Sequence, residues 1–293
     1  MQQQTTTANY IVGGHPIRIT MRGGNIAEKF PTMEPFKVEE TGEPLFTINV
    51  DNSIIPSWQG NRVGTFPCPS ATFEVYRQSN GAYQVLILND NAPAAFIESD
   101  AEYKNFTVAT RGDEILQLFG LSNAAMLIFT MSTAGHDTLL MHSSTVENSG
   151  KAYMFLGKSG QGKSTHSDLW VKHIAGSTLI NDDNPIIRIA PDGTPTVYGS
   201  PWSGKRPIYK NVHYPIGGFA AIEQEKENNI RRESIPTAFG ILLSSTSTMK
   251  FDKDIHLKVC NTVSKVLSKI PVYTLGCRPD AEAAQMSSKT FGL

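Results

Sequence analysis

Residues 157–165 have the sequence Gly-Lys-Ser-Gly-Gln-Gly-Lys-Ser-Thr, which matches the pattern G-x-x-x-x-G-K-[ST] at every defined position. Glycines in such a loop let the backbone turn back on itself, so that several N–H groups can point at one anion. The lysine places a positive charge on the outer phosphates, and the hydroxyl that follows it can ligate Mg²⁺. The pattern therefore predicts a phosphate-binding loop, whose nine residues are Gly157, Lys158, Ser159, Gly160, Gln161, Gly162, Lys163, Ser164 and Thr165.

The segments on either side of this loop fit the prediction. Ala152–Leu156 is a short apolar run of the strand type, and Lys163–His173 contains no glycine or proline and favours a helix. A strand, a glycine-rich loop and a helix in this order bring a bound phosphate to the N-terminus of the helix. Because both flanks agree, we prefer this prediction to the alternative of a glycine-rich turn that matches by chance.

Composition narrows the class of protein. The 293 residues allow one large domain or two ordinary ones, and 40% hydrophobic with 18% charged residues is typical of a globular chain. The formal net charge of −1 gives no reason to expect nucleic acid or an anionic membrane as a partner. Cys68, Cys260 and Cys277 are widely separated, so we expect neither a zinc site nor a disulfide, but buried or idle thiols in a reducing compartment.

Targeting signals are not evident in the sequence. The first ten residues have neither a basic start nor an apolar core, so they do not predict a signal peptide. The most apolar stretch, 124–131, is much shorter than a bilayer-spanning segment. We therefore expect a cytoplasmic protein.

The sequence changes character near residue 110. Before it, short β-type runs alternate with glycine-containing turns, which predicts a β-rich N-terminal region over residues 1–110. The runs are Tyr10–Val12, Ile17–Met21, Phe46–Val50, Ala71–Tyr76, Tyr83–Leu88 and Phe106–Ala109. Two roles remain open for this region, a contribution to a substrate groove and pairing into the sheet of the second domain for stability.

Residues 111–293 are predicted to form the second, catalytic domain. The expected strands are Met141–Glu147, Ala152–Leu156, Ser177–Ile180, Ile186–Ile189, Thr196–Tyr198 and Val272–Leu275. The expected helices are Asp113–Thr133 (as one helix or two), Lys163–His173, 252–270 and Pro279–Ser288. The segment 199–210 is rich in glycine and proline and is expected to be a loop.

Two acidic residues follow the predicted loop helix. Asp182 lies 19 residues after Lys163, and Asp183 comes next, at the end of a predicted strand. Carboxylates at this place can hold the Mg²⁺ that bridges phosphates or accept a proton from an attacking hydroxyl. The alternative is a turn, because Asn and Asp favour turns. Two features argue against an ordinary doubly wound nucleotide hydrolase. The spacing from Lys163 to Asp182 is short, and the strand before the loop follows a hairpin turn at 148–150 instead of a parallel crossover.

These elements resemble a known family. His142 at the start of the upstream strand, the loop 157–165 and the pair Asp182–Asp183 are similar to the catalytic domain of HPr kinase/phosphorylase, whose nucleotide-binding fold is shared with ATP-dependent phosphoenolpyruvate carboxykinase. The resemblance covers roughly residues 110–290 and implies an α/β fold with a mixed sheet. Segments 198–205 and 271–280 look like a distinct bacterial branch that includes kinases of peptide-modification clusters.

The resemblance implies roles for single residues. Lys163 would bind the β- and γ-phosphates, and Ser164, Asp182 and Asp183 would be metal ligands. Asp182 would also be the general base. His142 would lie beside the phosphates, although a lone histidine can equally be structural.

One departure from the family concerns the region after the acid pair. HPr kinases have a glutamate-containing signature there, whereas 199–205 has no carboxylate. This departure counts against HPr itself as the substrate and weakens the case for phosphorylase activity, which stays open. Lys205 and Arg206 would contact a phosphate or an acidic acceptor, or else be solvated side chains.

The sequence thus predicts a kinase that depends on ATP and Mg²⁺ and transfers the γ-phosphate to a hydroxyl, in a protein or peptide serine or in a small metabolite. Such a transfer needs bound phosphates, neutralised charge and one base aimed at the nucleophile. The alternatives are a nucleotide hydrolase that drives a conformational change, a non-catalytic nucleotide sensor and a carboxykinase. The identity of the acceptor and the oligomeric state stay open.

Overall fold

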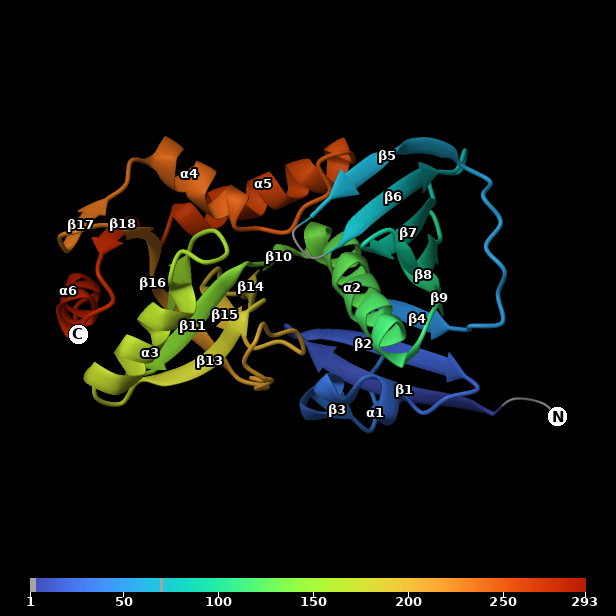
Figure 1. Cartoon of the computed structure of the whole chain (residues 1–293), viewed down its shortest axis with the longest axis horizontal. Helices are drawn as coiled ribbons and strands as arrows, with labels where there is room; N and C mark the ends of the chain where they lie inside the picture. Colours follow the sequence, from blue (N-terminus) through green and yellow to red (C-terminus); the bar gives the residue numbers. More distant parts are fainter. Residues whose placement is uncertain (1–3, 69–70) are drawn as a thin grey trace. The chain divides into compact units, whose positions relative to one another are not determined.

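The computed structural model describes residues 4–68 and 71–293. The chain divides into two compact units, Met1–Ser132 and Thr133–Leu293 (Figure 1). Each unit is built around a mixed β-sheet, so the protein belongs to the α/β class in a β-rich form.

The sheet of the N-terminal unit has the strand order β3-β1-β2-β4-β9-β8-β7-β6-β5. Its strands are β1 (Thr5–Val12), β2 (His15–Arg22), β3 (Lys37–Val38), β4 (Phe46–Val50), β5 (Asn61–Pro67), β6 (Thr72–Arg77), β7 (Tyr83–Asn89), β8 (Ala92–Ser99) and β9 (Asn105–Thr110). The pairs β2–β4 and β4–β9 are parallel, and the other pairs are antiparallel. Two short helical segments, α1 (Ile26–Lys29) and η1 (Pro31–Phe36), connect β2 to β3.

Alternating apolar residues explain most of these strands. In β4, Phe46, Ile48 and Val50 are buried and the residues between them are half-buried, as expected where one face of a sheet covers the core. Each of the six β-type runs predicted in this region overlaps a strand. The sequence missed β5 because its residues are mostly exposed and lack an apolar alternation, so only pairing with β6 defines it.

Helix α2 (Glu114–Thr133) is a single helix that belongs to the N-terminal unit. A Cβ on its Gly120 would lie 2.4 Å from the Ala94 carbonyl oxygen of β8. The ring of Phe129 packs edge-on against Phe46 of β4, with 6.4 Å between centroids. These contacts explain why the units divide after Ser132 and not near residue 110, where the sequence placed the boundary.

The apolar segment inside α2 is longer than the sequence suggested. Among the described residues, Glu114–His136 is the one helical stretch that is long and apolar enough to cross a membrane. Half of its most apolar window is buried inside the protein. A single helix of this kind is weak evidence for a membrane span, because the core helix of a globular unit passes the same test of length and composition.

The sheet of the C-terminal unit has the order β10-β14-β15-β16-β12-β11-β13, and β18 pairs with both β16 and β17. Its strands are β10 (Thr138–Leu140), β11 (Ser143–Asn148), β12 (Lys151–Leu156), β13 (Thr178–Asp183), β14 (Ile186–Ile189), β15 (Pro195–Tyr198), β16 (His213–Gln224), β17 (Asn229–Arg232) and β18 (Val272–Cys277). Its helices are η2 (Ala134–His136), α3 (Lys163–His173), α4 (Ile235–Ser244), α5 (Lys253–Leu267) and α6 (Ala281–Thr290). The pairs β12–β16 and β16–β18 are parallel, whereas β12 pairs antiparallel with β11.

The strand, loop and helix around residues 151–173 have the predicted form. The turn 148–150 is also confirmed: Ser149 and Gly150 both have positive φ, 53° and 76°, as the twist of a two-residue hairpin demands. Each predicted strand and helix of this unit overlaps an observed one. The predicted strand Met141–Glu147 begins later, however, because Met141 forms an isolated bridge with Thr246 and β11 starts at Ser143.

The sequence missed β16, although it lies between β12 and β18 in the sheet. This strand contains Gly217 and Gly218, residues that usually weaken a strand. Added Cβ atoms would lie 2.5 Å from the ring of Tyr153 and 2.4 Å from the ring of Phe291. Both glycines therefore make room for aromatic rings, and this requirement is visible only in the folded structure.

Trp170 anchors α3 to the sheet. Its fully buried ring lies 5.5 Å from Phe155 of β12 and 6.0 Å from Phe291, measured between centroids. Its indole nitrogen donates a 2.8 Å hydrogen bond to Ser287 Oγ of α6. Because α3 is fixed in this way, the loop that precedes it is held at the end of β12.

Two helical glycines provide a test of this packing. We expect Gly120→Ala to lower the free energy of unfolding by about 1–3 kcal/mol, since the new methyl group overlaps the backbone of β8. Gly240→Ala in α4 is the matched control, because its Cβ would meet no atom within 4 Å. It should raise stability by about 0.5–1 kcal/mol through helix propensity. Urea denaturation measures both, and equal effects would contradict the proposed packing of α2.

Candidate functional site

The glycine-rich loop, residues 157–165, adopts a conformation that requires its glycines. Gly157, Gly160 and Gly162 have positive φ values of 144°, 81° and 104°. A Cβ on Gly157 would also lie 2.7 Å from Gln161 Oε1, the oxygen that accepts a hydrogen bond from the Lys158 N–H. Gly162 caps α3, so the loop leads directly into the N-terminus of a helix, where anions bind favourably.

Lys163 is 8% exposed, and its ammonium group has three partners. Nζ lies 2.9 Å from His142 Nε2, 2.9 Å from the Gly157 carbonyl oxygen and 3.3 Å from that of Lys158. Burial lowers the pKa of Lys163, and the negative charges of Asp183 and Asp182 act in the opposite direction. The lysine thus lies under the loop, beside both acids.

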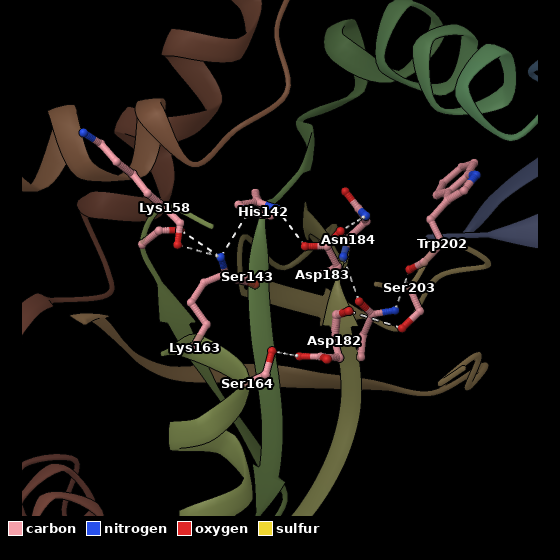
Figure 2. Close-up of polar contacts among 12 residues, drawn as sticks. His142, Ser143, Lys158, Lys163, Ser164, Asp182, Asp183, Asn184, Trp202 and Ser203 are labelled. Carbon is pink, nitrogen blue, oxygen red and sulfur yellow. Dashed lines mark hydrogen bonds and ion pairs between the residues drawn. The ribbon is translucent and has the colours of Figure 1, made fainter. Parts of the chain in front are cut away.

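His142 connects the lysine to the acid pair (Figure 2). It lies just before β11, and its backbone N–H donates to the Ser245 carbonyl at 2.6 Å. Because a lysine ammonium can only donate, His142 Nε2 accepts from Lys163 and Nδ1 carries the proton. Nδ1 lies 2.9 Å from Asp183 Oδ1, so the histidine donates to this carboxylate and has a defined tautomer.

Asp182 lies in β13 opposite Ser144 of β11 and is 5% exposed. One carboxylate oxygen accepts from Ser164 Oγ at 2.9 Å, and the other accepts from Arg206 Nε at 2.6 Å. Burial by itself raises the pKa of Asp182, but the hydrogen bonds from Arg206, Ser144 and Ser164 outweigh burial and lower it. Asp182 is therefore an ionised group with both oxygens engaged.

Asp183 has a different environment. Its side chain is 34% exposed, compared with 6% for Asp182. Besides His142, it accepts a 3.0 Å hydrogen bond from Asn184 Nδ2. Its φ of 145° is rare for a residue with a side chain, and such conformations persist only where the surroundings impose them. Here an isolated bridge to Ser203 and the contact with His142 fix the residue.

The loop 199–210 covers one side of the acid pair. Gly204 N–H donates to the Asp182 carbonyl at 2.6 Å, and Ser203 Oγ donates to the same oxygen at 3.3 Å. Trp202 is buried, with 4% exposure. Arg206 of this loop bridges Asp182 and Asp168 of α3.

Asn181 holds this loop in place from inside the protein. It is fully buried, its Nδ2 donates to the Trp202 carbonyl at 2.9 Å, and its Oδ1 accepts from the Asn184 N–H at 2.9 Å. Neither Asn181 nor Asn184 was predicted from the sequence to be a site residue. Their position on either side of the acid pair, in Asn-Asp-Asp-Asn, is the signal that could have revealed them.

Six of the residues predicted from the sequence meet at one place. Hydrogen bonds or ion pairs link the side chains at this place, which are His142, Lys163, Ser164, Asp182, Asp183 and Arg206. Arg206 pairs with Asp182, one of the two acids, and with Asp168, and its predicted contact with a phosphate or an acceptor stays a prediction. Lys205 is exposed next to it. The side chain of Lys158 points away from the acid pair (Figure 2).

The donor atoms of this site suit one type of metal. In the part of the chain that the structure describes, no group of three or more His, Cys, Asp or Glu side chains is arranged to hold a metal ion. Ser164 Oγ and Asp182 Oδ1, 2.9 Å apart, are hard oxygen donors. Mg²⁺ is usually bound by one or two carboxylates together with phosphate and water, so the pair fits Mg²⁺ better than a metal enclosed entirely by protein ligands.

Comparison of the sequence with protein-family models gives no match, and comparison with curated proteins gives no relative at the threshold of significance. The function must therefore be argued from the geometry of the site.

Replacement of Asn181 tests how far this site depends on the loop 199–210. We expect Asn181→Ala to lower the free energy of unfolding by about 1–3 kcal/mol, since it removes a donor to the buried Trp202 carbonyl and the acceptor of the half-buried Asn184 N–H. The control is Asn229→Ala, which removes an exposed hydrogen bond to Glu225 and should cost less than about 0.5 kcal/mol. Thermal or urea unfolding distinguishes the two, and a neutral Asn181 variant would show that the loop is held by other contacts.

Proposed function

We propose that this protein is a kinase that depends on ATP and Mg²⁺ and transfers the γ-phosphate to a hydroxyl group. The observation that carries the proposal is the hydrogen-bonded chain from the glycine-rich loop to the acid pair, Lys163–His142–Asp183, next to the contact between Ser164 and Asp182. Phosphoryl transfer needs this combination of an anion-binding loop, a metal-binding carboxylate and a base within reach.

The loop would hold the phosphates through its N–H groups and the N-terminus of α3. Lys163 already has its charge at this position, and its contacts with two loop carbonyls and His142 would be exchanged in part for phosphate oxygens. Ser164 Oγ and Asp182 are the groups that would hold Mg²⁺. When bound, this ion would supply positive charge to the phosphate oxygens.

The roles within the acid pair follow from their different surroundings. The resemblance to HPr kinases implies Asp182 as the general base. The hydrogen bonds that lower the pKa of Asp182 make it a weak proton acceptor. Asp183 is more exposed, and the Nδ1–H of His142 orients it. We therefore assign the base to Asp183, metal binding to Asp182 and orientation of the base to His142.

Other features support the wider proposal. The loop follows a strand that pairs antiparallel with β11 on one side and parallel with β16 on the other. This mixed arrangement agrees with the resemblance to the HPr-kinase and carboxykinase type of fold. We include that fold, and a cytoplasmic location, in the proposal. The acceptor would be a protein or peptide serine or a small hydroxylated compound.

Incubation of the purified protein with γ-labelled ATP, Mg²⁺ and a panel of acceptors tests the function. The panel should include serine-containing peptides, a protein mixture and small hydroxylated metabolites. Label that appears on an acceptor only in the presence of the enzyme supports the kinase. Release of labelled phosphate that no acceptor changes would instead indicate a nucleotide hydrolase.

The loop lysine provides the first mutational test. Lys163→Ala should abolish nucleotide turnover while the protein stays folded, because the charge beside the phosphates is lost. Lys158→Ala, in the same loop but with an exposed side chain, is the control and should keep most of the activity. Circular dichroism monitors folding, and a folded Lys163 variant with unchanged turnover would remove the loop from the mechanism.

The acid pair provides the second test. Asp183→Asn should lower kcat by about 10²–10⁴-fold, since an amide cannot accept the hydroxyl proton, and should leave the Mg²⁺ requirement unchanged. Asp182→Asn should instead raise the Mg²⁺ concentration needed for half-maximal activity. Steady-state rates measured over a range of Mg²⁺ concentrations separate these effects. If Asp182→Asn is the variant that loses kcat at saturating Mg²⁺, the roles within the pair are reversed.

A further inference from the structure

A pocket of about 590 Å³ lies on the side of the glycine-rich loop away from β11. Loop residues 160–162 form one wall, and the first half of α3 forms another, with Thr165 and Leu169. The remaining walls come from the ends of β16 and β18 and the residues that follow them. These two strands run parallel to each other and to β12, and ligands of α/β sheets bind at the carboxyl ends of such strands.

The order of the strands gives this pocket a defined relation to the acid pair. β12, which leads into the loop, lies between β11 and β16. His142 and the acid pair belong to the side of β11 and β13, whereas the pocket belongs to the side of β16 and β18. A molecule that spans the loop therefore has one end at the acids and the other end in the pocket.

We propose that this pocket takes the nucleoside of a nucleoside triphosphate, with the γ-phosphate directed toward Asp183. The inference rests on the proposed function and adds the direction in which the nucleotide binds and the residues that recognise its base. The volume lies within the range of pockets for small ligands, and the loop at its edge provides the phosphate contacts.

The lining has the chemistry that an aromatic base requires. Leu169, Ile222 and Pro279 supply apolar surface for the faces of the ring. Cys277 also lines the pocket, and burial raises the pKa of its thiol to about 11, so it is a neutral wall and not a nucleophile. Gln224 donates a 3.1 Å hydrogen bond to the Gly160 carbonyl, which ties the floor of the pocket to the loop.

Arg278 is the residue to which we assign recognition of the base. Its side chain lines the pocket and is 53% exposed, and its guanidinium pairs with Asp280 at 3.1 Å and with Glu282 at 3.6 Å. A planar cation held by two carboxylates can stack on the face of a base. Stacking of this kind favours any aromatic base, and it gives a nucleoside triphosphate an advantage over a bare triphosphate.

Isothermal titration calorimetry with the full-length protein tests the proposal. The ligands are ATP and inorganic tripolyphosphate, each with Mg²⁺. ATP should bind at least about 10-fold more tightly than tripolyphosphate. Arg278→Ala should weaken ATP about 10-fold and leave tripolyphosphate unchanged, as expected for a lost cation–π contact.

The chain offers a matched control in Arg231. Its side chain is 51% exposed and also pairs with two carboxylates, Glu223 and Glu233, but it lies on β17 and does not line the pocket. Arg231→Ala should change neither affinity. Equal affinities of the wild-type protein for ATP and tripolyphosphate, or equal losses for both ligands in Arg278→Ala, would overturn the proposal.

Failure of this inference can be distinguished from failure of the proposed function. Acceptor labelling without any preference for ATP over tripolyphosphate would leave the kinase in place and remove the nucleoside pocket. A preference for ATP that depends on Arg278, without transfer to any acceptor, would support the pocket and count against the kinase.

Discussion

The hydrogen bond between Lys163 Nζ and His142 Nε2 is the contact on which the site depends. It joins a loop that follows β12 to a histidine that precedes β11, and the histidine passes the contact on to Asp183. Burial of a lysine is unfavourable unless its donors are satisfied, and here His142 and two loop carbonyls satisfy them. The same contact leaves Nδ1 of His142 as the donor toward the carboxylate. A positive charge, a neutral imidazole and an acid are thus connected before any ligand arrives.

The register of two strand pairs places the acids correctly. β11 pairs with β12 on one side and with β13 on the other, so that Ser144 faces Asp182 and Ser143 faces Asp183. A slip of one residue would exchange the two faces of β13 and would take Asp182 away from Ser164. Trp170 helps to place Ser164, the hydrogen-bond partner of Asp182, because its contacts with Phe155 and α6 hold α3 against the sheet. The loop and the acids meet because the strand register places the acids on β13 and the packing of Trp170 holds α3 and its loop at the end of β12.

The two carboxylates are adjacent in sequence, yet their surroundings separate them chemically. Hydrogen bonds from Arg206 and Ser164 keep Asp182 ionised and engaged, and the exposed carboxylate of Asp183 is bound mainly through His142. This difference supports the assignment of metal binding to one acid and proton acceptance to the other. The position of β12 between β11 and β16 also separates two parts of the proposed ligand site. The acid pair, where the γ-phosphate would react, lies on one side, and the pocket bordered by Arg278 lies on the other.

The sequence by itself determined the elements whose signals are local. The glycine pattern, the apolar run before it and the uninterrupted segment after it define the strand, loop and helix, and the pair Asp182–Asp183 marks the end of a strand. Only the tertiary structure decided the membership of α2 in the N-terminal unit, the presence of the glycine-containing strand β16, and the binding of Arg206 to Asp182. These features depend on contacts between residues far apart in the chain, such as the space that Gly218 leaves for Phe291. Local propensity carries no information about such contacts, because their free energy exists only when both partners have been brought together.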